Sequence, residues 1–183
     1  MMRYFFLLIV FLLSLWLFLK GNSRISNDEI PIFLKVDAIN FAHATEIEIK
    51  FKSFFKPTLA ELEILKKDYS AIWAHLNHLY ATNDVLAGKE YYTEAWFKHI
   101  CLMYNGPEKH NLIRKDLKHE VVINNWASDG LVCTLTDSVK VAYYLPNSNP
   151  QIYKIPVSMV VLFQGDHWRI DAIKVSKKRI IDS

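Results

Sequence analysis

The stretch VSMVVLFQGDHWRIDAIKV, residues 157–175, decides the fold of this chain. Apolar side chains fill both halves of the stretch, and Gly165-Asp166 separates them. A Gly-Asp pair between two such runs is a strong signal for a tight turn that joins antiparallel strands. The stretch therefore predicts a hairpin of two strands, Tyr153–Gln164 and His167–Val175.

Two more strands are predicted before that hairpin, at Leu117–Trp126 and Leu131–Leu145. Ser128-Asp129-Gly130 supplies a turn between them, and Pro146–Pro150 connects the second one to the hairpin. Because these connections are short, neighbouring strands are expected to pair antiparallel. The last third of the chain therefore predicts a meander of antiparallel strands.

Helices are predicted between residues 58 and 106. Thr58-Leu59-Ala60-Glu61 matches a capping box, in which the Thr hydroxyl and the Glu carboxylate accept hydrogen bonds from free backbone amides. Apolar side chains then recur every three or four residues up to Asn83, which indicates one buried face of a long helix. Thr93 is expected to cap another helix, which Asn105-Gly106-Pro107 ends.

Before the capping box, two stretches alternate between apolar and polar residues. They predict strands at Ile32–Phe41 and Thr45–Phe55, the second of which has Lys50 and Lys52 on its polar face. Together, these elements predict an α+β domain of helices packed on a bent antiparallel sheet, with two extra N-terminal strands.

Residues 4–19, YFFLLIVFLLSLWLFL, are sixteen consecutive residues without a charge. As a helix the run is about 24 Å long, shorter than the ~30 Å hydrocarbon core of a bilayer. It is also slightly longer than the ~7–15 residues of a signal-peptide core. An uncleaved membrane anchor is favoured because no Ala-x-Ala cleavage site follows the run, and a cleaved signal or a buried core helix are the alternatives. Anchor and signal both place the remaining chain outside the cytoplasm, either membrane-anchored or secreted after cleavage.

Composition narrows the possible functions. Five glycines are too few for a Gly-rich phosphate loop, and a net charge of +3 does not indicate a nucleic-acid-binding protein. Lys177-Lys178-Arg179 is expected to be a solvated terminus, with contact to anionic lipid or nucleic acid as the alternative. Cys101 and Cys133 are either paired in an oxidising compartment or two separate buried thiols.

Three passages carry a resemblance to a known superfamily. They are LNHLYATNDVLAGKEYYTEAWF at residues 76–97, the strand Leu131–Leu145, and residues 157–175. This pattern of a long helix, a short helix, a Thr-to-Trp helix start and a Trp-bearing final hairpin resembles the nuclear transport factor 2-like superfamily, also called cystatin-like or SnoaL-like. The resemblance implies a cone-shaped domain over about residues 58–175. The superfamily contains isomerases, cyclases, dehydratases and non-catalytic interaction domains.

A second resemblance concerns the arrangement of the whole chain. One N-terminal span before an exported cone domain is similar to membrane-anchored assembly subunits of type IV secretion machines. The segment YYTEAWFKHI at residues 91–100 resembles a helix start of one such group.

The predicted elements divide the chain into four parts. They are an anchor or signal at 1–24, a spacer and strand pair at 25–57, the cone domain at 58–176 and a basic tail at 177–183.

Candidate catalytic residues are polar residues at inward positions of the predicted strands. Asp137 falls in the apolar register of its strand, and His119 shares a face with Val121 and Ile123. Such a pair can act as a general base with its orienting partner, and Tyr143 or Tyr153 could donate to a developing oxyanion. In the structural alternative, Thr136-Asp137-Ser138 forms a bulge that turns Asp137 outward, and His119 is solvated near the start of its strand.

No metal or other cofactor is predicted. His75 and His78 are three residues apart on the long helix, but both fall off its apolar face and are expected to contact solvent. No third ligand follows at a suitable spacing, and no Cys-x-x-Cys or His-Glu-x-x-His motif occurs. The Trp residues are expected to be core residues rather than a ligand platform.

The sequence therefore favours a membrane-tethered interaction or assembly domain without catalysis. It would contact the membrane through residues 4–19 and bind protein partners, or form a homodimer through the outer face of its sheet. The alternative is a cone-fold small-molecule-binding protein or enzyme that uses Asp137, His119 and Tyr143.

Overall fold

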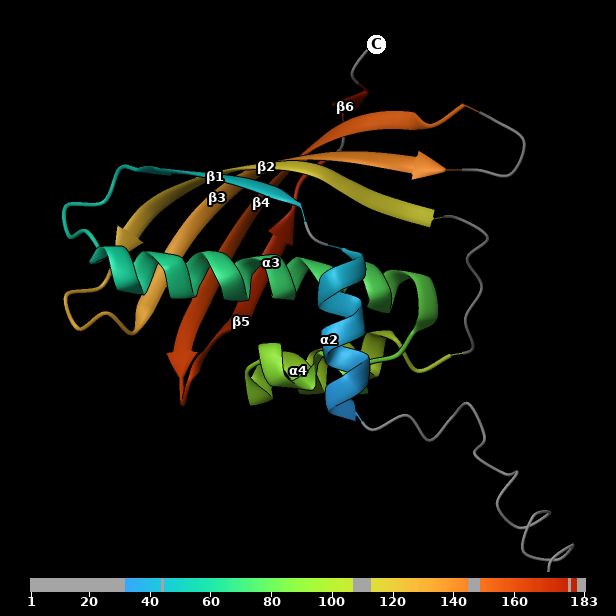
Figure 1. Cartoon of the computed structure of the whole chain (residues 1–183), viewed down its shortest axis with the longest axis horizontal. Helices are drawn as coiled ribbons and strands as arrows, with labels where there is room; N and C mark the ends of the chain where they lie inside the picture. The colour runs from blue at the N-terminus through green and yellow to red at the C-terminus, as the bar shows by residue number, and fades with distance from the viewer. Residues whose placement is uncertain (1–31, 44, 107–112, 145–148, 178, 181–183) are drawn as a thin grey trace, which may run out of the picture. The chain divides into compact units, whose positions relative to one another are not determined.

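A computed structural model describes residues 32–43, 45–106, 113–144, 149–177 and 179–180 (Figure 1). Contacts divide the chain into two compact units, residues 1–34 and 35–183, and the second contains the sheet and the helices packed on it. The helical elements are α2 (Ile32–Ala42), α3 (Leu59–Thr82), the 3₁₀ helix η2 (Leu86–Tyr91) and α4 (Glu94–Met103). The strands are β1 (Glu46–Phe51), β2 (Ile113–Trp126), β3 (Val132–Tyr144), β4 (Gln151–Gln164), β5 (His167–Val175) and β6 (Arg179–Ile180).

The sheet has the strand order β1-β2-β3-β4-β5, and β6 also pairs with β4. Strands β2 to β5 form the predicted antiparallel meander, which is confirmed. Strand β1 pairs with β2 in parallel, so the prediction of a purely antiparallel sheet is wrong and the sheet is mixed. A parallel pair arises because the chain crosses from β1 to β2 through α3, η2 and α4 rather than through a hairpin. The tail predicted to be solvated is exposed at Lys177 and Arg179, and the Arg179 backbone pairs with Lys154 of β4.

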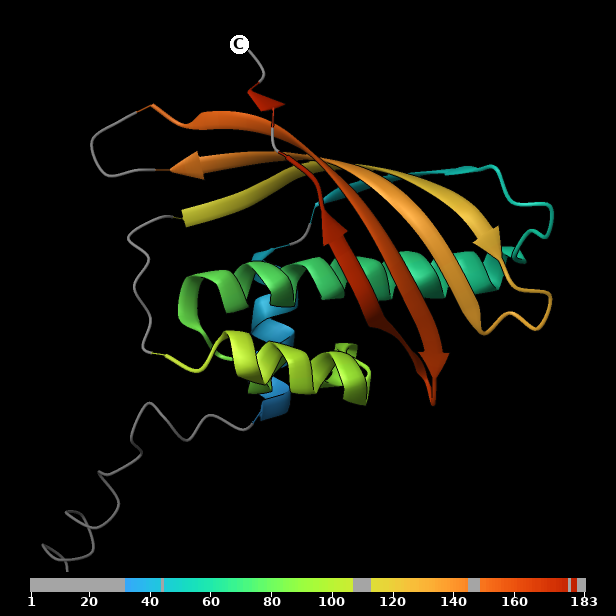
Figure 2. The same cartoon turned by 180° about the vertical axis from the view of Figure 1, so that it is seen from behind.

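The helices cover one face of the curved sheet (Figures 1 and 2). Helix α3 contacts β2 and β5, and α4 contacts β5. The predicted capping box is confirmed: the Thr58 side chain accepts from the Glu61 amide at 3.3 Å, and the Thr58 amide donates to the Glu61 carboxylate at 2.7 Å. Thr93 caps α4 by accepting from the Trp96 amide at 3.2 Å.

The segment predicted as a strand at Ile32–Phe41 is helix α2, so that prediction is wrong. Within it, the buried side chains Val36 and Ile39 are three residues apart, which is a helical spacing. Ile39 packs against Ala74 of α3 and Ala87 of η2, whose small side chains admit it. The sequence pattern of this short segment fits both a strand and a helix, so burial against α3 and η2 decides its conformation.

No helix among the described residues is long and apolar enough to cross a bilayer. The predicted anchor or signal, residues 4–19, lies outside the described residues.

Candidate functional site

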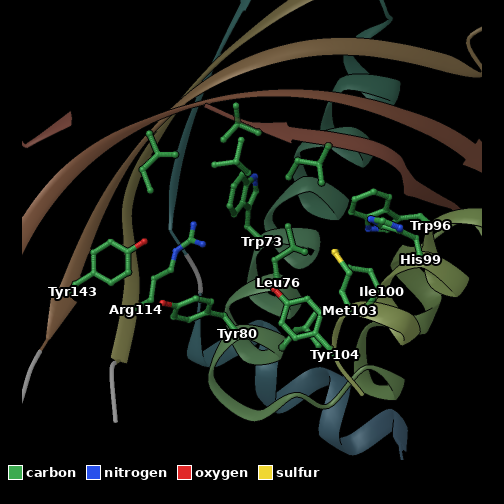
Figure 3. A pocket seen from close by; sticks show the side chains of 15 residues that line it. Trp73, Leu76, Tyr80, Trp96, His99, Ile100, Met103, Tyr104, Arg114 and Tyr143 are labelled. Carbon is green, nitrogen blue, oxygen red and sulfur yellow. The ribbon is translucent and has the colours of Figure 1, made fainter. Parts of the chain in front are cut away.

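A pocket of about 380 Å³ lies between the helices and the concave face of the sheet (Figure 3). Helices α3 and α4 supply most of its apolar wall, and the strands supply the opposite side. The lining residues are Trp73, Leu76, Leu79, Tyr80, Trp96, His99, Ile100, Met103, Tyr104, Arg114, Tyr143, Ile155, Val157, Ile173 and Val175.

Polar side chains lie on two sides of the pocket. Arg114 of β2 and Tyr143 of β3 are paired across neighbouring strands and lie together opposite Trp96 and His99 (Figure 3). Arg114 contributes a permanent positive charge, and no Asp or Glu is found among the lining residues that the structure describes. The pocket thus combines a large apolar surface with one cationic end.

Two contacts fix the position of the Arg114 side chain. Its guanidinium lies over the ring of Trp73, 5.3 Å from the ring centroid, where the π-electron face attracts a cation. Its Nη2 atom donates to Asp116 Oδ1 at 3.2 Å. The Arg114 side chain is 14% exposed and that of Asp116 only 1%, so the cation, not the carboxylate, faces the pocket.

Behind Arg114, a polar network is buried in the core. Asp137 Oδ2 lies 2.6 Å from His119 Nδ1 and accepts a hydrogen bond of 2.6 Å from the Tyr69 hydroxyl. On the other side of the ring, His119 Nε2 is 3.6 Å from Asp116 Oδ2, an ion-pair distance. Asn77 also donates to Asp116 Oδ2, at 2.6 Å. The network therefore connects Tyr69 to Arg114 through two carboxylates and one imidazole.

A β-bulge makes this network possible. The register of β2 against β3 shifts between Asp116 and Lys118. In a regular strand, Asp116 and His119 would point to opposite faces because they are three residues apart. The extra residue at Leu117 places both side chains on the buried face.

The charged groups of the network stabilise one another's ionised forms. Burial alone lowers the pKa of His119, but the neighbouring Asp116 and Asp137 carboxylates outweigh burial and raise it. Burial alone raises the pKa of Asp116, but His119 and Arg114 outweigh burial and lower it. Burial, followed by the Asp137 charge, raises the pKa of Tyr69 well above its ordinary value, so its phenol remains a donor. The network thus favours an imidazolium between two carboxylates.

The structure confirms the predicted inward positions of Asp137 and His119, and the alternative of an outward Asp137 is wrong. The third candidate, Tyr143, lies elsewhere, since it lines the pocket and Asp137 and His119 do not. A catalytic role for the three residues stays a prediction. The arrangement separates the acid–base pair from the cavity that a substrate would occupy.

Two residues of the site were missed from the sequence. Arg114 and Asp116 both lie before Leu117, where the strand was expected to start. Strand β2 begins earlier, at Ile113. The available signal was the alternation of apolar Ile113 with Arg114, but so short a pattern does not distinguish a strand from a loop.

Other side chains also differ from expectation. His75 was expected to contact solvent but is 1% exposed, because η2 covers that side of α3 and Tyr91 stacks on the imidazole with ring centroids 5.0 Å apart. Of the two alternatives left open for the cysteines, pairing does not occur, because both thiols are free. The alternative of two buried thiols holds only for Cys133, since Cys101 is exposed. Trp73 and Trp168 are core residues as expected, but Trp73 and Trp96 also line the pocket.

Within the ranges that the structure describes, no group of three or more His, Cys, Asp or Glu side chains is arranged to hold a metal ion. No model of a known protein family matches the chain. No curated protein is significantly similar to it in sequence.

Proposed function

We propose that this protein is a small-molecule-binding domain that acts without catalysis and is held at a membrane by residues 4–19. The observation that carries the proposal is the pocket of about 380 Å³, a volume in the ~300–1,000 Å³ range of small-molecule sites. Its walls are mainly apolar, with a few polar groups among them and Arg114 beside Tyr143 at one end, as in sites that bind the body of a ligand and orient its head.

A binding role is favoured over catalysis by the position of the titratable pair. The His119 and Asp137 side chains are both 0% exposed, and the Tyr69, Trp73 and His119 rings pack together. A general base must come within hydrogen-bonding distance of the proton that it removes. A ligand in the pocket meets Trp73 and Arg114 before it can reach this pair.

The membrane part of the proposal rests on the apolar run of residues 4–19 alone. Membership of the nuclear transport factor 2-like superfamily likewise stays a prediction from sequence.

Fluorescence energy transfer tests binding in the pocket. The full chain is placed in lipid nanodiscs and titrated with phenylnaphthylamine, a neutral apolar probe that accepts tryptophan excitation. Trp73 and Trp96 line the pocket, so a probe bound there is expected to receive energy efficiently.

A pocket-filling variant separates pocket binding from partition into lipid. Leu76→Phe combined with Ile173→Phe adds two rings from opposite walls and is expected to weaken binding at least tenfold. The matched control is Leu102→Phe with Ile113→Phe, whose side chains are 76% and 68% exposed. Equal transfer in all three proteins would show that the probe only enters the bilayer, and the proposal would be wrong.

A second candidate is the membrane-tethered interaction domain, and an exposed apolar patch favours it. Phe54, Phe55 and Leu59, in and after the loop from β1 to α3, are 91%, 49% and 84% exposed, and the two Phe rings meet edge to face. Exposed apolar clusters of this kind commonly mark interaction sites. The outer face of the sheet, where a homodimer was expected, instead exposes polar side chains such as Thr136, Lys140 and Ser158.

Sedimentation of the full chain in detergent micelles tests this candidate. If the patch joins two copies, wild type is expected to sediment as a dimer and Phe54→Ser with Phe55→Ser as a monomer. Leu102→Ser is the control, because it removes an apolar side chain on α4 that is 76% exposed, a value between those of Phe54 and Phe55. A monomeric wild type would rule out self-association through the patch.

A further inference from the structure

The polar groups around the pocket are rich in hydrogen-bond donors, and the side chains among them that can also accept are His99 and three tyrosines. Arg114 has only N–H donors, and the indole of Trp96 likewise has a donor and no acceptor. Three lining tyrosines add hydroxyls, while a carboxylate, the strongest acceptor in proteins, is absent from the described part of the lining. A ligand that matches this lining must bring its own acceptors.

Two of these donors are unsatisfied in the part of the chain that the structure describes. Arg114 Nε and Trp96 Nε1 are both buried and have no hydrogen-bond partner among the described residues. A buried donor without a partner is destabilising. Both nitrogens have almost no accessible surface, so a ligand in the cavity meets the exposed part of the Arg114 guanidinium rather than these two atoms.

The polar network behind Arg114 holds the guanidinium of Arg114 so that its positive charge faces the cavity. The Asp116 carboxylate binds one Nη of Arg114 from the far side and is also used by Asn77 and His119. The remaining guanidinium donors are held in place by Trp73 beneath them. A fixed guanidinium fork matches the geometry of a carboxylate or another planar oxyanion.

We infer that the ligand is an organic anion, with an apolar or aromatic body against α3 and α4 and an acidic head on Arg114. This inference rests on the proposed function and adds the chemical class of the ligand. The head lies where Arg114 and the Tyr143 hydroxyl approach each other, and the body points toward Trp96 (Figure 3). Asp116 is a positioning residue, since it holds Arg114 but does not line the pocket.

A pair of probes tests the charge preference. Phenylnaphthylamine is neutral, and anilinonaphthalene sulfonate has the same rings with one added anionic group. Both are titrated in nanodiscs against wild type and Arg114→Met, which keeps the length of the side chain and removes the charge. The expected result is that Arg114→Met weakens sulfonate binding about tenfold or more, as for loss of a hydrogen bond to a charged group, and changes neutral-probe binding less than threefold.

Arg114→Met leaves Asp116 with fewer partners, so a second measurement keeps Arg114 unchanged. Naphthalene acetate and naphthalene acetamide, which have the same shape, compete with bound phenylnaphthylamine. The acid is expected to displace the probe at about a tenfold lower concentration than the amide. The same displacement measured with the pocket-filling variant gives the background signal for both competitors.

The outcomes separate the two proposals. If phenylnaphthylamine binds in the pocket but the amide competes as well as the acid, the inference of an anionic ligand is wrong and the proposed function survives. The inference is equally wrong if Arg114→Met weakens the binding of both probes to the same extent. If neither probe binds better to wild type than to the pocket-filling variant, both proposals fail.

Discussion

Replacing His75 by Phe is expected to make the protein more resistant to acid. His75 is 1% exposed, and neither ring nitrogen has a hydrogen-bond partner among the described residues. Burial, together with the nearby His78 and His43 and despite Asp84, lowers the pKa of His75 from 6.5 to about 4. Folding therefore keeps this imidazole neutral over a pH range in which the unfolded chain protonates it.

The sign and size of the effect follow from that difference. Above pH 6.5, the ring is neutral in both states and contributes no pH dependence. As the pH falls from 6.5 to about 4, the unfolded chain binds a proton that the folded chain does not, so the free energy of unfolding decreases. At about 1.4 kcal/mol per pKa unit, the total loss is about 3 kcal/mol. Below about pH 4, the ring is protonated in both states and the loss is complete.

Urea unfolding of the full chain in detergent micelles, followed by near-ultraviolet circular dichroism at several pH values, measures this loss. Phe preserves a ring against Tyr91 and removes the buried nitrogens. The free energy of unfolding of His75→Phe is expected to fall about 3 kcal/mol less than that of wild type between pH 6.5 and 4.

The matched control is His99→Phe, because water already solvates that exposed ring in the folded state. It is expected to change the pH dependence far less. Equal acid sensitivity of wild type and His75→Phe would refute the reasoning and show that His75 is hydrated or paired in solution.

Three further substitutions test the network and the local structure through the same urea assay. Asp137→Leu leaves His119 without its closest carboxylate and is expected to cost about 3–5 kcal/mol; a cost below about 1 kcal/mol would mean that the pair is not formed. Thr58→Ala removes the side-chain cap of α3 and is expected to cost about 1 kcal/mol, and an unchanged midpoint would argue against the capping box. Gly130→Ala forces a side chain onto a residue with φ of 73° and is expected to cost about 1–2 kcal/mol, whereas Gly106→Ala, with open space around it, should be nearly neutral.

Local patterns predicted those elements whose hydrogen bonds and burial repeat along the chain. The capping box at Thr58, the hairpin at Gly165-Asp166 and the strand alternation around Asp137 each depend on residues close in sequence. The same alternation placed Asp137 and His119 on the buried face. These features appear in the structure at or near the predicted residues.

Sequence patterns gave wrong predictions where packing against a distant element decides the conformation or the burial of a residue. Segment 32–41 is a helix because Ala74 and Ala87 leave room for Ile39, and His75 is buried because η2 and Tyr91 cover that side of α3. Neither neighbour is visible in the local sequence, because it comes from another part of the chain.

The sequence by itself determined an α+β fold with a meander, a capped long helix and an inward Asp–His pair. It also determined the uncharged run at residues 4–19, whose role stays a prediction. Only the tertiary structure decided that Asp137 and His119 are sealed behind Trp73 while Arg114 lines a cavity. The physical reason is that alternation fixes which face of a strand a side chain occupies, whereas a bulge at Leu117 and the packing of α3 and α4 decide what that side chain meets.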